Sequence, residues 1–271
     1  MEINRLNVNE VVNKSGLKPD KDYGQNYLIE PSICERIVNL LEVKDDDHVL
    51  EIGPGIGSLT HFLTQTNAKE IDLVDIDQRM IDFLKILYQQ KNTNLIVSDI
   101  RKHDISNYTK ILGNLPYNIT TETVVYLLKN ATKAQKLVLM CQTETLAHFY
   151  DVSGKEYGPV SVLIHLLGNI ESKFVVKAGS FYPAPKCTST VFTISFYENA
   201  DFNLSWNVYQ LAKQMFLNRR KTIHNNLSNY LKDKNLAENI LDEIGVDPKK
   251  RPEELKPEIY LYLFEKIKTI S

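Results

Sequence analysis

The 271-residue chain has little cysteine and no long apolar run, and both absences narrow what it can be. Its three cysteines, Cys34, Cys141 and Cys187, are widely spaced and lack the spacing of metal ligands. We expect them to be reduced, buried thiols in a cytoplasmic protein. The first residues contain no apolar signal-peptide segment, and no stretch of about eighteen apolar residues could span a membrane.

The chain also lacks an excess of charge of one sign. Its 32 basic and 34 acidic residues give a net charge of −2. This balance excludes a protein that coats nucleic acid by bulk charge, so any contact with RNA or DNA must come from a local basic face. The six histidines show no metal spacing, and no pattern indicates a serine or cysteine nucleophile. We therefore expect no metal.

The order of apolar patterns predicts an α/β fold. Short strands are expected at residues 48–52, 71–76, 95–97, 111–112 and 137–140, and helices at residues 59–63, 80–87 and 121–128. This alternation indicates a mostly parallel sheet with helices on both faces. Two later apolar runs, at residues 174–176 and 190–196, have no helix between them and predict an antiparallel hairpin that closes the sheet.

The two ends of the chain have a different character. Residues 1–22 are polar, and we expect a loosely held arm before a helix that begins at Pro31. After residue 200 the patterning is helical, with a break at residues 247–252 and a last helix opened by Pro257. The length suits one large domain and one small one. We place them at residues 1–200 and 201–271.

A glycine loop, Glu51-Ile-Gly53-Pro-Gly55-Ile-Gly57, follows the first of the alternating strands. Glycines at such a turn let the backbone approach a small ligand without Cβ clashes. A dinucleotide fingerprint would need glycine or alanine at the position of Ser58. The carboxylate of Glu51 would repel a pyrophosphate but suit a cationic amino group and a sulfonium. The loop therefore favours S-adenosylmethionine as the cofactor.

Acidic residues end the next two strands. Asp75 lies 24 residues after Glu51, where a carboxylate can accept hydrogen bonds from both ribose hydroxyls of a nucleoside. Asp77 is the competitor for that role, but we expect it to cap the helix that starts near Gln78. Asp99 ends the third strand and could accept from the adenine amino group of the cofactor.

The motif Asn114-Leu115-Pro116-Tyr117 is suited to hold an amino group of a nucleobase. The nitrogen of such a group is a poor nucleophile, because its lone pair is delocalised into the ring. Acceptors at the Asn114 side chain and the Leu115 carbonyl could hold both hydrogens and direct the lone pair at a methyl carbon. Pro116 stiffens the turn, and Tyr117 offers a ring to stack on an extruded base. We infer methyl transfer to N6 of adenine.

Two further segments carry possible RNA contacts. Phe181 stands before the proline-stiffened run Tyr182-Pro-Ala-Pro185 and could stack on the other face of the base. Arg219-Arg220-Lys221 lies in a stretch from Phe202 to Lys232 that has five basic residues and no acid. This run is a candidate for phosphate contacts.

Taken together, these motifs resemble the small-subunit ribosomal RNA adenine N6,N6-dimethyltransferases, the kasugamycin-sensitivity methylase family. The resemblance runs from about Tyr23 to the C-terminus. It is carried by Tyr23-Gly-Gln-Asn-Tyr-Leu28, Glu51-x-Gly-Pro-Gly-x-Gly57, Asn114-Leu-Pro-Tyr117, Phe181-x-Pro-x-Pro-Lys186 and Arg219-Arg-Lys-Thr222. The ribose-binding acid of the family is usually Glu, where this chain has Asp75, and residues 142–150 lack the family's usual Lys and Arg.

The resemblance implies a class I S-adenosylmethionine-dependent methyltransferase, with a Rossmann-like seven-stranded sheet and a small all-α C-terminal domain. It implies dimethylation of two adjacent adenines in the 3′-terminal hairpin of 16S rRNA, by a monomer that acts on an assembling 30S particle. Implied cofactor residues are Gln25, Asn26, Leu28, Glu51, Gly53, Gly55, Asp75, Ile76, Asp99, Ile100 and Asn114. Tyr117 and Phe181 would enclose the target base.

Two alternatives stay open on the sequence. A large-subunit (23S) rRNA adenine methylase that confers macrolide resistance would share nearly the whole core. Leu115 favours the small-subunit group, because the resistance enzymes more often carry Ile there. The other alternative is a ribosome-assembly checkpoint that acts mainly by binding immature small subunits, and the intact Asn114 motif argues against binding alone.

Overall fold

The computed structural model describes residues 2–20, 24–88 and 92–270. The chain divides into two compact units. The first runs to Thr143 and includes Glu171–Phe196, and the second comprises Glu144–Ile170 and the residues from Tyr197 onward. In the described part of the chain, no helix is both long and apolar enough to cross a membrane.

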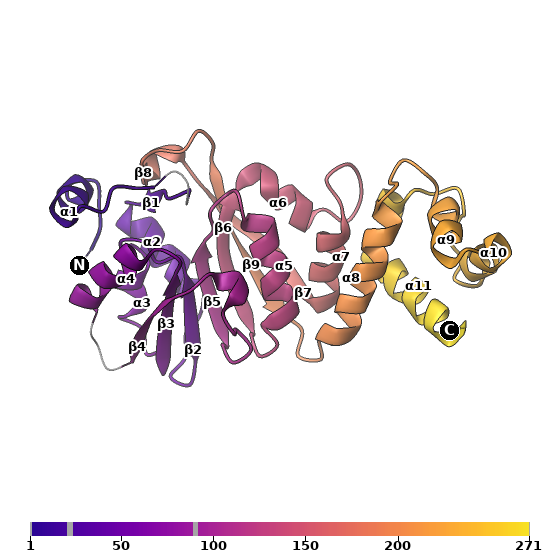
Figure 1. Ribbon diagram of the computed structural model, residues 1–271, viewed down its shortest axis with the longest axis horizontal. Helices are drawn as coiled ribbons and strands as arrows, with labels where there is room; N and C mark the ends of the chain where they lie inside the picture. The colour runs from indigo at the N-terminus through magenta and orange to yellow at the C-terminus, as the bar shows by residue number, and fades with distance from the viewer. Residues whose placement is uncertain (1, 21–23, 89–91, 271) are drawn as a thin grey trace. The chain divides into compact units, whose positions relative to one another are not determined.

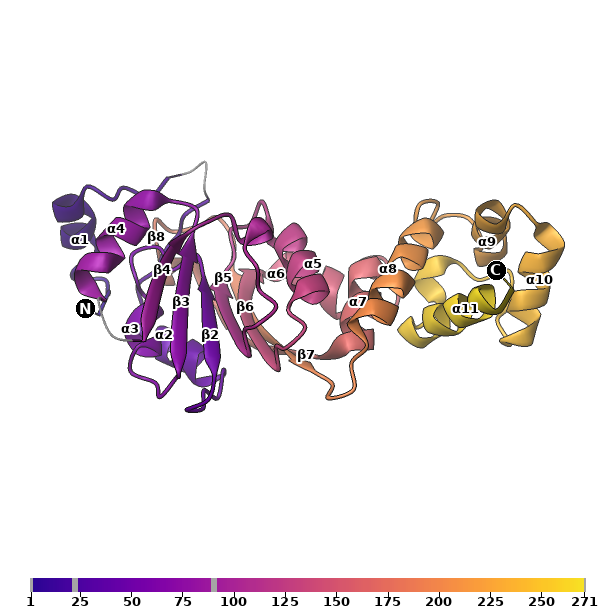
Figure 2. The ribbon, with the colours of Figure 1, turned by 60° about the horizontal axis from the view of Figure 1, so that its bottom comes forward.

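The first unit contains most of a seven-stranded sheet in the order β4-β3-β2-β5-β6-β9-β7 (Figures 1 and 2). Its strands are β2 (His48–Ile52), β3 (Glu70–Asp75), β4 (Thr93–Val97), β5 (Lys110–Asn114), β6 (Lys136–Gln142), β7 (Gly168–Val176) and β9 (Ser189–Phe196). Strands β4, β3, β2, β5 and β6 are parallel, and β9 is antiparallel to β6. This confirms the predicted mostly parallel sheet.

Helices that connect the strands supply much of the core. They are α2 (Pro31–Asn39), α3 (Thr60–Leu63), α4 (Gln78–Leu87) and α5 (Thr120–Asn130). Cys34 of α2, Leu63 of α3 and Leu84 of α4 are fully buried in one apolar cluster with β2 and β3. Asp77 caps α4 by accepting a bond from the Arg79 N–H, as predicted. Pro31 is the first residue of α2, where its missing N–H costs nothing.

The N-terminal segment differs from the prediction of a loosely held arm. Helix α1 (Val8–Ser15) lies within it, and Ile3, Val8 and Val12 are at most 2% exposed. These side chains form an apolar cluster with Tyr27, Ile56 and Met80. Polar composition hid this packing because the few apolar residues are concentrated on one face of the helix. Residues 21–23, where Tyr23 of the first motif falls, lie outside the described residues.

Two short strands join segments far apart in the sequence. β1 (Tyr27–Leu28) pairs antiparallel with β8 (Phe181–Tyr182), so that Leu28 lies opposite Phe181. β7 and β9 are neighbours at the edge of the large sheet, as the predicted hairpin requires, and the segment between them contains the 3-10 helix η2 (Ala178–Ser180) and β8, one strand of a second small sheet. Another 3-10 helix, η1 (Ile100–Lys102), follows β4.

The second unit is largely helical. It contains α6 (Thr143–Tyr150) apart from its first residue, and α7 (Pro159–Leu167), α8 (Phe202–Phe216), α9 (Ile223–Leu231), α10 (Lys234–Glu243), η3 (Pro252–Glu254) and α11 (Pro257–Ile270). The break at residues 247–252 and the helix opened by Pro257 are confirmed. The boundary that we placed at residue 200 leaves residues 144–170 in the first domain, whereas the structure groups them with the second unit. They join this unit because Tyr157 and Val162 are buried in the same apolar cluster as Val208 of α8.

The cysteines are free, as expected. Cys34 and Cys141 are buried, and burial raises the pKa of each thiol to about 12, which makes both unreactive at neutral pH. Cys187 differs from the prediction, because it is only partly buried.

Candidate active site at the carboxyl edge of the sheet

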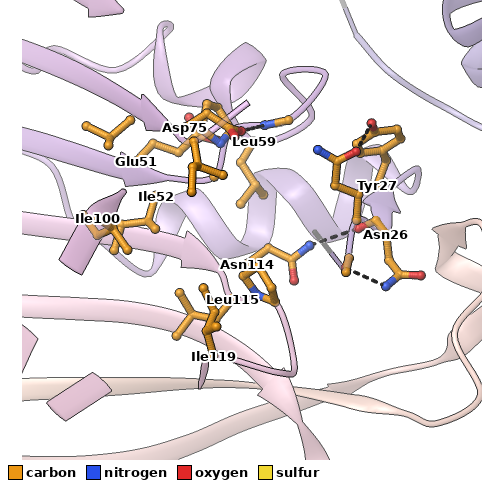
Figure 3. Close-up of a pocket in the computed structure, with 18 of the residues that line it drawn as sticks. Asn26, Tyr27, Glu51, Ile52, Leu59, Asp75, Ile100, Asn114, Leu115 and Ile119 are labelled. Atoms are coloured by element: carbon orange, nitrogen blue, oxygen red, sulfur yellow. Dashed lines mark hydrogen bonds between the residues drawn. The ribbon is translucent and has the colours of Figure 1, made fainter. Parts of the chain in front are cut away.

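The carboxyl ends of parallel strands β2, β3, β4 and β5 meet at one edge of the sheet, and a pocket opens there (Figure 3). This is where ligands bind in open α/β sheets. The predicted residues that line it are Gln25, Asn26, Leu28, Glu51, Gly53, Gly55, Asp75, Ile76, Asp99, Ile100, Asn114, Leu115, Pro116 and Tyr117. Elements from the first 119 residues thus converge on one site.

The glycine loop needs its glycines. Gly53 and Gly55 have φ angles of +63° and +55°, a region that side chains with a Cβ rarely adopt. A Cβ at Gly55 would also lie 3.2 Å from the ring of Tyr27. At Gly53 a Cβ would meet nothing within 4 Å, so the backbone there faces open space. A ligand can therefore approach the main chain closely at this turn.

Asp75 shapes the loop as well as the pocket. Its Oδ2 accepts a hydrogen bond from the Gly55 N–H at 3.2 Å, and its Oδ1 accepts from the Asp77 N–H at 2.9 Å. Burial raises the pKa of this carboxyl to about 6, although these backbone donors oppose the shift. The side chain is 7% exposed and lines the pocket, so lone pairs remain available to a ligand hydroxyl.

Glu51, predicted to face the cationic groups of the cofactor, is almost completely buried. It is 1% exposed, and its Oε2 accepts the Thr60 hydroxyl at 2.8 Å. Burial raises its pKa to about 8, so the free protein carries this carboxyl largely protonated at pH 7. A cation bound nearby would favour the ionised form.

Asp99 is held by a residue that the sequence analysis did not single out. Arg101 donates from Nε to Oδ1 at 3.0 Å and from Nη2 to Oδ2 at 2.8 Å, and its Nη1 donates to Glu122 at 2.7 Å. The Arg101 hydrogen bonds lower the pKa of Asp99. Arg101 lines the pocket. The sequence signal that could have identified Arg101 is its position two residues after Asp99, a predicted cofactor residue.

Asn114 lies at the end of β5 and faces the pocket (Figure 3). Its Nδ2 donates to the Asn26 carbonyl at 3.2 Å, which orients the amide and leaves Oδ1 as a free acceptor among the described residues. The Leu115 N–H donates to the Met140 carbonyl at 3.1 Å and anchors the motif to β6. Thr120 donates to the Pro116 carbonyl at 2.9 Å, so the turn is fixed at both ends.

The two aromatic residues expected to enclose a base lie in different surroundings. Tyr117 lines the pocket, and its hydroxyl lies 3.0 Å from the Ser189 Oγ, which fixes the ring. Phe181 does not line the pocket. It is 3% exposed and packs in the core beside Val176, Val191 and Leu28. Phe181 is therefore a core residue in this conformation, and its stacking on a base stays a prediction.

Other pocket residues were not predicted because apolar lining leaves no chemical pattern in a sequence. Leu59 and Ile119 form part of the wall shown in Figure 3. Such residues exclude water and shape the cavity around a few polar groups.

The basic run lies in the second unit, in the loop between α8 and α9. Arg219 pairs with Glu253 at 3.5 Å and donates to the Gly154 carbonyl at 3.2 Å, so it has a structural role there. Arg220 and Lys221 are exposed. Two of the three predicted RNA-contact side chains are thus free to reach a phosphate.

Comparison with known proteins agrees with this geometry. Residues 16–269 match the family model for ribosomal RNA adenine dimethylase. A protein of Malacoplasma penetrans named ribosomal RNA small subunit methyltransferase A is 36% identical, with 92% of each chain covered. A protein of the same name from Lactobacillus johnsonii is 34% identical, with 90% of this chain and 89% of the relative covered.

Solved structures support the fold. A dimethyladenosine transferase from Plasmodium falciparum superposes with a TM-score of 0.77 at 23% identity, covering 90% of this chain and 98% of the other. The 23S rRNA methyltransferase ErmE gives a TM-score of 0.70 at 23% identity, covering 90% and 100%. With a class I methyltransferase fold, a glycine-loop pocket and the matched family model in agreement, the chain belongs to the ribosomal RNA adenine dimethylase family of S-adenosylmethionine-dependent enzymes.

Proposed function

We propose that this enzyme methylates N6 of two adjacent adenines in the 3′-terminal hairpin of small-subunit rRNA, giving N6,N6-dimethyladenosine. The two relatives described above are both named as small-subunit methyltransferases, and their similarity to this chain covers about nine-tenths of their length. The observation that carries the chemistry is the free Oδ1 of Asn114, held at the pocket by the Nδ2 bond to the Asn26 carbonyl.

The pocket residues fit S-adenosylmethionine. The open space beside Gly53 admits the cofactor close to the main chain, and Asp75 offers acceptor positions for ribose hydroxyls. Its carboxylate is shorter than the glutamate usual in the family, and the bonds to Gly55 and Asp77 hold it in one orientation. Asp99, fixed by Arg101, supplies an acceptor for an adenine amino group. The cofactor would supply an electrophilic methyl group on a sulfonium.

The Asn114 motif would prepare the amine for attack. The Asn114 Oδ1 and the Leu115 carbonyl have no intramolecular donor among the described residues, so both can accept an N6 hydrogen. Two acceptors placed this way favour a tetrahedral nitrogen and direct its lone pair away from them, toward the donor methyl group. The gain comes from positioning, because no side chain has to remove a proton beforehand.

Tyr117 would hold the extruded base. Stacking on such a ring contributes about 1–3 kcal/mol per base. The hydroxyl bond to Ser189 keeps the ring in place before the base arrives, which lowers the entropy cost of binding. With Phe181 buried in the core, stacking in this conformation would be one-sided.

The setting of the reaction follows from the substrate. We propose that the exposed Arg220 and Lys221 contact rRNA phosphates and that the enzyme acts as a cytoplasmic monomer on an assembling small subunit. The helical second unit would contribute this contact, while the first unit would hold the pocket.

The experiment is methyl transfer from labelled S-adenosylmethionine to purified ribosomal subunits isolated without the modification. We expect label in the small subunit, with mass mapping to two dimethylated adenines near the 3′ end. Label confined to the large subunit would overturn the substrate and favour the 23S alternative. Absence of label on either subunit, with small-subunit binding intact, would favour a binding role.

A further inference from the structure

A second cluster of polar side chains lies at the opposite edge of the sheet from the pocket. His48 and Glu70 are the first residues of β2 and β3 and are register partners, and Asp72 lies two residues further along β3. The sequence did not indicate a site here, because Glu70 lies 22 positions after His48. Parallel pairing brings the three side chains to one face, with donor atoms that all lie within 4.8 Å of one another.

The His48 ring nitrogen lies close to both carboxylates but donates no hydrogen bond to either. The His48 Nε2 lies 3.3 Å from the Asp72 Oδ2 and 3.6 Å from the Glu70 Oε2. This nitrogen is inaccessible to solvent and has no hydrogen-bond partner among the residues that the structure describes. Ligand atoms at zinc-ligand bond lengths in a tetrahedron lie about 3.4 Å apart. The two separations from His48 Nε2 therefore match the spacing of ligand atoms around a small cation.

The carboxylates are arranged as metal ligands usually are. Asn94 donates from Nδ2 to the Asp72 Oδ1 at 2.8 Å and to the Glu70 Oε1 at 2.7 Å, and so holds both acids together. Tyr108 donates to the Asp72 Oδ2 at 2.6 Å and lies 2.8 Å from the His103 Nε2. Outer hydrogen bonds of this kind fix the orientation of metal ligands.

The charge of the cluster also needs a counterion. In the described part of the chain, no Lys or Arg nitrogen lies within 4.0 Å of the Glu70 or Asp72 carboxylate. Asp72 is 6% exposed, and two carboxylates held this close repel each other unless a positive charge lies between them. One imidazole nitrogen with two carboxylates favours a transition metal such as zinc over magnesium or calcium.

We propose that His48, Glu70 and Asp72 form a zinc-binding site that joins the amino ends of β2 and β3. Water would fill the fourth position. The His48 ring packs against Tyr108, with the ring centroids 4.4 Å apart and the planes tilted by 53°, and this contact helps to hold the orientation of the imidazole. The role is structural, because the site lies at the other end of the strands from the glycine loop and Asn114.

The test is zinc titration of full-length protein stripped with a chelator, followed by calorimetry. We expect about one zinc per chain with a Kd in the micromolar range or below, and a Tm raised by several degrees. His48→Gln and Glu70→Gln should each weaken binding at least tenfold and abolish the Tm rise. Glu70 is partly exposed, so this second variant should fold even if the first does not.

A matched control is His148→Gln. His148 pairs with Glu156 at 3.4 Å in the second unit and, in the described part of the chain, belongs to no group of three such ligands, so its loss should leave zinc affinity unchanged. Co²⁺ added to stripped protein should give the visible absorption of a tetrahedral site, and Glu70→Gln should remove it. If the wild type binds no zinc, or if both variants bind it as tightly as the wild type, the proposal is wrong. Neither result depends on methyl transfer.

Discussion

The pocket in the first unit and the basic loop between α8 and α9 place their ionisable side chains in opposite surroundings. Glu51 and Asp75 are 1% and 7% exposed, and both depend on hydrogen bonds from neighbouring groups. Arg220 and Lys221 are exposed to solvent. Buried charges have shifted pKa values and act at short range with fixed partners, whereas exposed charges act through attraction that salt screens. The pocket should therefore determine the rate of methyl transfer, and the basic loop should determine the affinity for RNA.

The strongest test of this contrast is Asn114→Ala. Removing one positioned acceptor should lower methyl incorporation by about 100-fold or more, since comparable donors in other active sites contribute this much. Binding of small-subunit RNA should change little, because the basic loop is untouched. Single-turnover methyl transfer and RNA binding by filter retention measure the two effects. Asn107→Ala, an exposed asparagine outside the pocket, is the control.

Unchanged methylation in Asn114→Ala would remove this residue from the proposed chemistry. Retained binding of immature small subunits by an inactive variant would show that binding and catalysis separate. A checkpoint that acts by binding alone would lose nothing in this variant.

The next effect concerns Asp75→Ala. Charge-assisted hydrogen bonds contribute on the order of 1.5–3 kcal/mol each, so cofactor affinity should fall by roughly 10- to 100-fold. RNA affinity should stay within twofold. Calorimetry with S-adenosylmethionine checks the first and filter binding the second, with Asp82→Ala on the exposed face of α4 as the control. Equal cofactor affinity in wild type and variant would exclude Asp75 from the site.

The wild-type pocket should also respond to pH. Because burial raises the pKa of Asp75 to about 6, the carboxyl of the free protein becomes protonated as pH falls through 6. The protonated form has fewer lone pairs for ribose hydroxyls, so cofactor affinity should decrease below pH 6. Asp75→Ala should show a flatter profile between pH 5 and 7. A wild-type profile as flat as that of the variant would contradict this prediction.

The basic loop should show a smaller, salt-dependent effect. Substituting Glu for Arg220 and Lys221 should make RNA binding less sensitive to salt. The slope of log K against log salt concentration should become shallower by roughly 1–2 units, because each phosphate contact releases condensed counterions. Cofactor affinity should not change. Reversal of the exposed Lys234 and Lys249 alters the net charge equally and is the control. If both pairs change the slope equally, the loop has no specific role. Arg219 is left in place because its bond to Glu253 is structural.

The smallest effect is on stability. The pKa of Glu51 rises from 4.5 to about 8 through burial, so this group favours the folded state at low pH, and that contribution is lost as pH rises through 8. Glu51→Gln cannot ionise. The Tm difference, variant minus wild type, should therefore increase by about 3 °C or more between pH 5 and pH 9. Glu35→Gln, on the exposed face of α2, should show no such trend.

The site residues whose positions could be predicted from sequence motifs are those at the ends of strands. Gly53, Asp75 and Asn114 each follow or end a predicted strand, and parallel pairing must bring such positions to one edge. Phe181 shows the limit of this reasoning. Its place before a proline-stiffened run indicated a ring that could stack on a base, but Phe181 pairs with Leu28 in the small sheet and is buried in the core. Periodicity cannot reveal a two-residue strand whose partner lies far away in sequence.

The sequence by itself determined the alternation of strands and helices, the glycine loop and the Asn114 turn, because these depend on local periodicity and backbone geometry. Only the tertiary structure decided the packing of the N-terminal helix, the clamp of Arg101 on Asp99 and the meeting of His48 with Glu70 and Asp72. These depend on which side chains share a face after the chain has folded, and on how much water is removed around them. Long-range register and burial are properties of the packed molecule, and no short window of residues contains them.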